Sequence, residues 1–551
     1  MQRYLWRHPW RLLVAGLLSL AAAAVLVTYS YVLQLITDIA TGRVSLAFTV
    51  AIPLVIGYLV LQAVTDSASE YWNEALPLQL AEELRNDLFQ RTLAQRPQQF
   101  RHKPVGEYVT QLTKQVDIVS ASYFHVILRA IYLVLLLILA AAGTLLIDPV
   151  ITLGVVALSI PALVFPFLVK KPLEHAKAEV VTTIERYTSR VTDSLSGFTT
   201  IAHALAQPPF FHQHQATAAA VKTASLRDQQ VQKIASGISD FLGDVMYLGT
   251  WLLGAYFVRR GQITLGQLVA FSQLASFFNW PLASLTAMLA EFYGARKVAT
   301  ELAALADRPL PAAAAPALPL TTPLIEADQV AYQSVLQNIS LQLDPAKKYL
   351  LVGASGSGKT TLMRLLLGEL TPTAGTATLS GQPAASLAPE SVFSAIGELE
   401  QQADIFAGTV RDNVTLFAPN YSDAQVTTAL TQAGLADWLT QHNLTTPVDR
   451  TSPLLSGGEK QRLAIARLLL RDYRFFVLDE LTTGLDPQIA AQLQDDIFAM
   501  PEGLIMITHQ YRAQTFAKAD TIFVMQAGRL IAQGPATDSA VAQALATLGL
   551  K

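Results

Sequence analysis

The segment Leu350-Leu-Val-Gly-Ala-Ser-Gly-Ser-Gly-Lys-Thr-Thr361 decides how the second half of the chain folds. An apolar run ends at Gly353 and an amphipathic run begins after Thr360, which predicts a strand that enters a helix through a glycine-rich turn. Glycines let successive backbone N–H groups point into one concavity, and the following helix adds the positive end of its dipole. Such a turn suits a polyanion.

The spacing fits G-x-x-x-x-G-K-[ST] at Gly353, Gly358, Lys359 and Thr360. The lysine can reach the β- and γ-phosphates of a nucleotide, and the threonine hydroxyl can ligate Mg²⁺. The order of strand, loop and helix favours this interpretation over a chance glycine-rich loop. The predicted nucleotide-binding residues of the loop are Gly353, Ala354, Ser355, Gly356, Ser357, Gly358, Lys359, Thr360 and Thr361.

The composition indicates a membrane portion. Hydrophobic residues make up 52% of the 551 residues and charged residues only 15%, which is too apolar for an ordinary soluble enzyme. The net charge of −3 gives no reason to expect a nucleic-acid partner. The absence of cysteine excludes disulfides and thiolate chemistry within the chain.

Six apolar stretches of the first half are long enough to span a bilayer. They arrange as three hairpins, one with a tight turn at Asp148-Pro149. The charge-free run from Leu12 exceeds the apolar core of a cleaved signal peptide, so we interpret it as an anchor. The six stretches are 12–36, 46–63, 130–147, 150–169, 241–258 and 265–290.

Lysine and arginine orient these spans. The two long polar excursions carry many of them, from Arg85 to Lys114 and from Lys170 to Arg227. The opposite loops are short: one carries Arg43, the turn at Asp148-Pro149 carries none, and Arg259-Arg260 in the last one go against the trend. The positive-inside rule therefore places both termini in the cytosol. Asp240 and Asp244 fall near the cytosolic end of the fifth span, where water reaches, which favours a solvated role over a transport role.

The pattern changes after residue 306. Residues 307–323 are rich in proline and alanine and predict an extended linker. From residue 324 to 551, short apolar strands alternate with amphipathic helices. The fold class is thus an all-α membrane domain of six spanning helices, residues 1–306, followed by a cytosolic α/β P-loop NTPase domain.

Two further strands of that domain end in polar residues. Asp479-Glu480 follow one, and His509 follows another. A strand-terminal acid beside a P-loop can hold Mg²⁺, a second acid can deprotonate an attacking water, and a histidine can contact the γ-phosphate. Strand-terminal acids and histidines are common, so each is a weak signal alone.

Leu455-Ser-Gly-Gly-Glu-Lys-Gln-Arg462 opens another helix and forms a second anion-binding helix start. One nucleotide needs only one P-loop, so this second start is surplus within a monomer. It has a use if it caps a phosphate held by another subunit. The alternative is an ordinary Ser-Gly loop before a helix.

Together these residues resemble the nucleotide-binding domain of an ABC transporter, because 455–461 matches that superfamily's signature motif. The resemblance implies that Tyr332 stacks on adenine and that Ser456 and Gly458 contact a nucleotide. It also implies that Gln401 contacts the nucleotide and Mg²⁺. It further implies Mg²⁺ ligation by Thr360 and Asp479, catalysis by Glu480 and His509, and a D-loop whose Asp486 contributes to nucleotide binding. Thr483-Gly484 depart from the usual Ser-Ala of that loop.

The first half resembles the exporter type of the superfamily at Phe100…Gly106-Glu107, Leu195-Ser196-Gly197 and 261–266. The resemblance implies coupling helices near 96–105 and 206–214 that dock on the ATPase domains. Plain solvated loops are the alternative for both. It further implies a half-transporter that dimerises with an identical or a different partner half and binds ATP and Mg²⁺.

We expect a multi-pass protein of a bacterial plasma membrane that exports an amphipathic or hydrophobic drug, lipid or peptide. Two other functions stay open: import of a compound such as a siderophore by the same fold, and a regulatory membrane ATPase that transports nothing. The direction of substrate accumulation separates the first two, and ATP hydrolysis without flux identifies the third.

Overall fold

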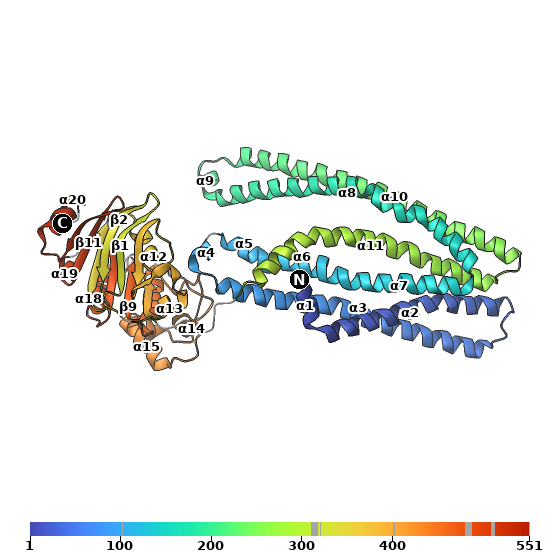
Figure 1. The fold of residues 1–551 in the computed structure, drawn as a ribbon, viewed down its shortest axis with the longest axis horizontal. Coiled ribbons are helices and arrows are strands. Elements are labelled where there is room, and N and C mark those ends of the chain that lie inside the picture. Colours follow the sequence, from blue (N-terminus) through green and yellow to red (C-terminus); the bar gives the residue numbers. More distant parts are fainter. Residues whose placement is uncertain are drawn as a thin grey trace. The chain divides into compact units, whose positions relative to one another are not determined.

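The computed structural model describes residues 1–101, 103–309, 318–319, 321–399, 403–479, 487–508 and 513–549. The chain forms two compact units (Figure 1). The first unit comprises Met1–Leu93 and Pro104–Pro309, and the second comprises Ala94–Lys103 and Leu310–Lys551. The ten residues Ala94–Lys103 therefore interrupt the first unit in sequence but pack with the second.

The first unit is helical throughout its described elements. Its elements are α1 (Gln2–Arg7), α2 (Pro9–Ala40), α3 (Phe48–Leu93), α5 (Val105–Thr110), η1 (Gln111–Gln115), α6 (Val116–Val119), η2 (Ser120–His125), α7 (Val126–Ile147), α8 (Pro149–Ser196), α9 (Phe198–His203), α10 (Gln207–Arg259) and α11 (Leu265–Ala306). Both η1 and η2 are π-helical, and they join α5, α6 and α7 into one continuous run.

Five helical segments of the described chain are long and apolar enough to cross a membrane: α2, α3, the run Val105–Ile147, α8 and α10. These match five of the six predicted spans. The sixth prediction falls on α11, a single helix that continues through Pro281, whose shorter apolar stretch is Leu265–Phe278. With 53 residues, α10 is about 80 Å long, so it extends well beyond a hydrocarbon core of about 30 Å.

The tight turn predicted at Asp148-Pro149 is present between α7 and α8. The Asp148 carboxylate accepts hydrogen bonds from the backbone N–H groups of Val150 at 2.8 Å and Ile151 at 2.9 Å. Pro149 occupies the first helical position, where no N–H is needed. The cap satisfies N–H groups that would otherwise lack partners at the helix start.

Helices α2, α3, α7 and α11 form the main bundle of the first unit, and α8 and α10 pack chiefly on each other (Figure 1). One core of the bundle lies where α1, α3, α6, η2 and α11 meet. It contains the fully buried side chains of Tyr4, Leu80, Val119, Phe124 and Leu302. Burial of these side chains fixes η2 against α3 and α11.

The second unit contains a six-stranded sheet in the order β12 (Arg529–Gly534), β11 (Thr521–Gln526), β3 (Lys348–Gly353), β10 (Gly503–Thr508), β9 (Phe475–Asp479), β6 (Ile396–Leu399). All neighbours pair in parallel except β12 and β11. A second, antiparallel sheet has the order β2 (Leu336–Leu343), β1 (Ile325–Tyr332), β4 (Ala374–Leu379), β5 (Gln382–Pro383). A short pair joins β7 (Gly408–Thr409) to β8 (Pro447–Val448).

Helices surround these sheets, as expected for the α/β half of the predicted fold. They are α4 (Pro97–Arg101), α12 (Lys359–Leu366), η3 (Ala384–Ser386), α13 (Pro389–Ala395), α14 (Val410–Thr415), α15 (Asp423–Gln432), α16 (Ala436–Gln441), α17 (Gly457–Leu469), α18 (Pro487–Phe498), α19 (Ala513–Ala517) and α20 (Ser539–Thr547).

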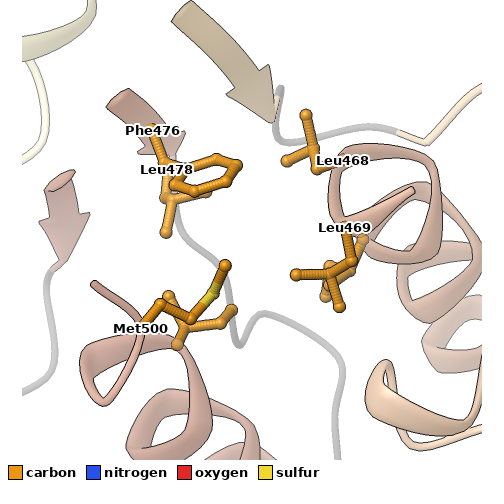
Figure 2. A pocket seen from close by; sticks show the side chains of 7 residues that line it. Leu468, Leu469, Phe476, Leu478 and Met500 are labelled. Atoms are coloured by element: carbon orange, nitrogen blue, oxygen red, sulfur yellow. The ribbon is translucent and has the colours of Figure 1, made fainter. Parts of the chain in front are cut away.

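Close packing holds α17 against the six-stranded sheet. Figure 2 shows Leu468 and Leu469 of α17 facing Phe476, Leu478 and Met500 across a small cavity of about 10 Å³. All its lining residues are hydrophobic. A space of this size is at the lower limit for one water molecule, and it offers water no polar partner. The helix that Ser456 caps therefore packs against β9 through hydrophobic side chains.

Candidate nucleotide-binding site

The parallel strands β3, β10 and β9 end at the same edge of the sheet, and several predicted site residues lie at or directly after these ends. Thr508 of β10 pairs with Val352 of β3, and Ile507 of β10 pairs with Asp479 of β9. In open α/β sheets, ligands bind beyond the carboxyl ends of the strands. The glycine-rich loop follows β3, and Asp479 is the last residue of β9.

Close backbone approach explains two glycines of the loop. A Cβ atom on Gly353 would lie 2.3 Å from the Met525 carbonyl oxygen of β11. Gly358 has φ +99°, which side-chain-bearing residues rarely adopt. The loop therefore folds tightly over the end of β3 and turns into α12, as the spacing predicts.

Lys359 and Ser357 are buried inside the loop. The Lys359 ammonium donates hydrogen bonds to the carbonyl oxygens of Gly353 and Ala354, both at 2.9 Å. The Ser357 side chain is only 4% exposed, and its hydroxyl has no hydrogen-bond partner among the described residues. Because buried polar groups are nearly always paired, the unpaired hydroxyl is consistent with a polar ligand in the loop.

Thr360 and Asp479 meet across the strand ends. The Thr360 hydroxyl donates a hydrogen bond of 3.3 Å to the Asp479 carboxylate. The two oxygen-bearing side chains expected to ligate Mg²⁺ are therefore neighbours. Thr361 lies in the first turn of α12 and is partly buried.

The hairpin that carries Tyr332 lies against the loop. Tyr332 ends β1 and pairs with Leu336, the first residue of β2. A Cβ atom on Gly358 would lie 2.8 Å from the Leu336 side chain. Tyr332 is partly exposed, as a ring that stacks on a base must be.

Ser456 caps α17, where the second anion-binding start was predicted. The Ser456 N–H donates to the Glu459 carboxylate at 2.7 Å, and the Glu459 N–H donates to the Ser456 hydroxyl at 3.3 Å. This capping box orders the first turn, which contains Gly458, and leaves Ser456 exposed.

Four predicted site residues lie outside the described part of the chain: Gln401, Glu480, Asp486 and His509. Glu480 directly follows the last residue of β9, and His509 directly follows the last residue of β10. The departure at 483–484 also lies outside it. The roles of these residues remain predictions.

A partly buried network that links α14 and α17 was not predicted. Arg467 of α17 donates to the Asn413 carbonyl at 2.6 Å and to the Asn413 side-chain oxygen at 3.0 Å. Asn413 in turn bonds both backbone groups of Phe406, at 2.9 and 2.8 Å. The network thus joins the segment that follows Gln401 to the helix that Ser456 starts.

Burial, together with the nearby charge of Arg471, lowers the pKa of Arg467 to about 10. The guanidinium therefore stays charged at neutral pH and depends on its Asn413 partners. The sequence contains one sign of this network, because Arg467 interrupts the apolar face of α17. It gives no sign of the partner Asn413, which lies 54 residues earlier in α14.

The short helix α4 packs with the second unit. The Arg101 guanidinium forms an ion pair of 2.9 Å with Glu369, whose side chain is only 5% exposed, and Arg96 donates to the Ala385 carbonyl at 2.9 Å. This docking agrees with the coupling helix expected near 96–105. The second expected coupling segment, near 206–214, stays a prediction: residues 207–214 form the start of α10, and the separate short helix before them is α9.

The matching family models cover most of the chain. Residues 336–483 match the ABC transporter family, and residues 12–282 match the ABC transporter transmembrane region. The chain belongs to the ABC transporter superfamily. The family match identifies the second unit of this transporter as an ATP-binding domain, and its loop, lysine and unpaired serine hydroxyl fit a nucleoside triphosphate.

Some proteins similar to this transporter are named as exporters, and another is named as an importer. A β-(1→2)glucan export ATP-binding/permease protein of Bartonella bacilliformis is 27% identical over 67% of the transporter and 63% of that protein, which is less than two thirds of its length. A putative export ATP-binding/permease protein of Rickettsia bellii is 25% identical over 86% and 84%. The mycobactin import ATP-binding/permease protein IrtB of Mycolicibacterium thermoresistibile is 28% identical over 72% and 70%.

A solved structure has the same fold. The structure of a bacterial Atm1-family ABC exporter with ATP bound superposes with a TM-score of 0.80, at 21% identity, over 99% of each chain. The fused helical and α/β halves therefore adopt the exporter architecture, as the sequence predicted.

Proposed function

We propose that this chain is one half of a dimeric transporter that hydrolyses ATP to export an amphipathic or hydrophobic compound. The observation that carries the proposal is that each chain contains one P-loop and one capped start of α17. Two chains would complete two sites, each with the loop of one subunit and Ser456 and Gly458 of the other. The exporter-like fold and the export names of several relatives support this function.

Each residue of the site has a defined role in the proposal. Lys359 and the loop N–H groups would bind the β- and γ-phosphates, and Tyr332 would stack on the base. Glu480 would take a proton from the attacking water while the γ-phosphoryl group leaves ADP, and His509 would hold that water or the phosphate. Asp486 would lie at the subunit contact.

Thr360, Asp479 and Gln401 would hold Mg²⁺, which neutralises phosphate charge when bound. The described residues contain no cluster of three or more His, Cys, Asp or Glu side chains that could hold a metal alone. A site with one hydroxyl and one carboxylate is typical of Mg²⁺ that also binds phosphates.

The two-chain site can be tested by mixing variants. Lys359→Met and Ser456→Arg should each abolish ATP hydrolysis when every subunit carries the change. A mixed dimer of the two variants retains one intact site, so we expect it to recover part of the activity. An inactive mixed dimer would contradict sites that are shared between subunits.

Import is a second candidate, favoured by the similarity to the mycobactin importer. Inside-out vesicles that accumulate a substrate with ATP indicate export, and right-side-out vesicles that accumulate it indicate import. A panel of drugs, lipids, peptides and siderophores should include the substrate. Hydrolysis without flux of any compound would instead indicate a regulatory ATPase. We place the transporter in a bacterial plasma membrane with both termini in the cytosol.

A further inference from the structure

A groove of about 400 Å³ lies in the first unit, between η2, α11 and the first residues of the chain. Its lining includes Tyr123 of η2 and Phe292, Arg296 and Thr300 of α11. The groove is separate from the nucleotide site, which belongs to the second unit.

One wall of the groove is a pair of stacked rings. The centroids of Tyr123 and Phe292 lie 4.8 Å apart, and their planes differ by 25°. Phe124 contacts Tyr123 edge-on at 5.7 Å and is fully buried, which holds the pair in place. Tyr123 is largely buried, with 9% of its surface exposed, and Phe292 is partly exposed, so Phe292 presents most of the apolar surface that an aromatic or acyl group could contact.

Arg296 supplies a cation without a carboxylate partner. It is exposed, and the described residues form no ion pair with it. The nearby acids of α11, Glu291 and Glu301, do not line the groove. In contrast, Arg3 pairs with Asp307 at the end of the same helix. The Arg296 guanidinium therefore keeps its donors for an anion.

The wall of the groove is a distorted helix that is firmly anchored. Tyr123 belongs to the π-helical segment Ser120–His125, and such segments occur often at functional sites. Ser120 donates to the Pro77 carbonyl of α3 at 3.2 Å. The groove is thus built from fixed elements and does not need to form around a ligand.

The position of Arg296 along α11 decides which molecules can reach the groove. Arg296 follows Leu265, the first residue of α11, by 31 positions, or about 47 Å of helix. That distance exceeds the hydrocarbon core of about 30 Å. The guanidinium therefore lies at or beyond the headgroup layer, where both a lipid phosphate and a water-soluble anion can reach it.

We propose that this groove binds an amphipathic organic anion. The apolar body would lie mainly on Phe292, which stacks on the largely buried Tyr123. The sulfate, phosphate or carboxylate would bind Arg296, with the Thr300 hydroxyl beside it. The ligand can be an anionic lipid or a dissolved compound, because both present the same chemistry.

Binding can be measured without nucleotide on the assembled full-length protein in phosphatidylcholine nanodiscs, so the result does not depend on ATP chemistry. The probe is 4-methylumbelliferyl sulfate, and 7-methoxy-4-methylcoumarin is its uncharged counterpart. We expect Arg296→Gln to weaken binding of the sulfate about tenfold, and Arg296→Lys to weaken it less. Binding of the uncharged probe should not change.

Lys297→Gln is the matched control, because it removes the same charge from the next residue, which does not line the groove. It should leave binding of the sulfate unchanged. Equal binding by wild type and Arg296→Gln would overturn the proposal, and so would equal losses in both variants.

Phosphatidylglycerol in the nanodisc separates the two sources of the anion. If it displaces the sulfate from wild type but not from Arg296→Gln, the groove binds a lipid headgroup. If it does not displace the sulfate and the affinity still depends on Arg296, the groove binds dissolved anions.

Discussion

The Thr360 hydroxyl lies 3.3 Å from the Asp479 carboxylate, although 119 residues separate them in the chain. The pair brings the start of α12 to the end of β9. A hydroxyl and a carboxylate at this separation are correctly placed to share one divalent cation with the phosphates of a nucleotide.

Thr360→Val should therefore weaken the binding of Mg²⁺-ATP by about tenfold, because it removes one oxygen ligand but keeps the side-chain volume. Affinity for ATP in the presence of EDTA should change little. Thr360→Ser restores the oxygen and should bind as wild type does. If Thr360→Val binds Mg²⁺-ATP normally, the hydroxyl is not a ligand.

Glu480→Gln should lower the rate of ATP hydrolysis by about 10²- to 10⁴-fold, the usual contribution of a general base, and should leave ATP binding intact. Phosphate release and equilibrium binding measure the two effects. Asp495→Asn changes an exposed acid that pairs with Lys518 and serves as the control. Near-normal hydrolysis by Glu480→Gln would show that another group activates the water.

Glu369→Gln should release the segment Ala94–Lys103 from the second unit, because Arg101 would lose its carboxylate partner. The loss should be about 1–3 kcal/mol, below that of a fully buried pair because Arg101 is partly exposed. Faster tryptic cleavage at Arg96, Arg101 or Lys103 would report the release. The exposed Glu390→Gln should keep the wild-type rate, and the exchange Arg101→Glu with Glu369→Arg should restore protection. Unchanged cleavage in Glu369→Gln would argue against the ion pair.

Asn413→Leu should destabilise the second unit by about 1–3 kcal/mol, because it removes the side-chain acceptor of the half-buried Arg467 guanidinium. Adding Arg467→Met removes the charge as well and should recover part of the loss. Melting temperatures in one detergent compare the variants. A double variant that is less stable than Asn413→Leu would refute this account.

Asp412 makes part of the stability depend on pH. Hydrogen bonds from the Thr409 hydroxyl and N–H lower the pKa of Asp412 in the folded protein. A lowered folded pKa means that the stabilisation is present above the unfolded pKa of about 3.9 and is lost as the pH falls through the folded value.

Asp412→Asn should lower the melting temperature at pH 7 by about 1–3 °C, the effect of a weakened helix cap. The difference from wild type should shrink as the pH falls below about 4. Glu390→Asn, also in a first helical turn but without this capping box, should show no such trend. A difference that is constant with pH would contradict the role of the carboxylate.

Local patterns made much of the fold predictable. The turn from β3 through Gly358 to α12 depends on a few consecutive residues, and the spans depend on unbroken apolar length. The π-helical segments Gln111–Gln115 and Ser120–His125 have no periodicity that distinguishes them from α-helix. The ion pair of Arg101 and Glu369 joins residues 268 positions apart, and no local pattern encodes such a partner.

The docking of Ala94–Lys103 has a practical consequence for work on the ATPase half. A soluble fragment that starts after the proline- and alanine-rich segment would lack Arg101. Of the two arginines that pair with Glu369 in the described part of the chain, the fragment would keep Arg364, whose nearest nitrogen is 4.0 Å away. Melting curves and turnover numbers obtained from such a fragment would describe a domain that lacks part of its own surface, and they would underestimate its stability in the intact chain.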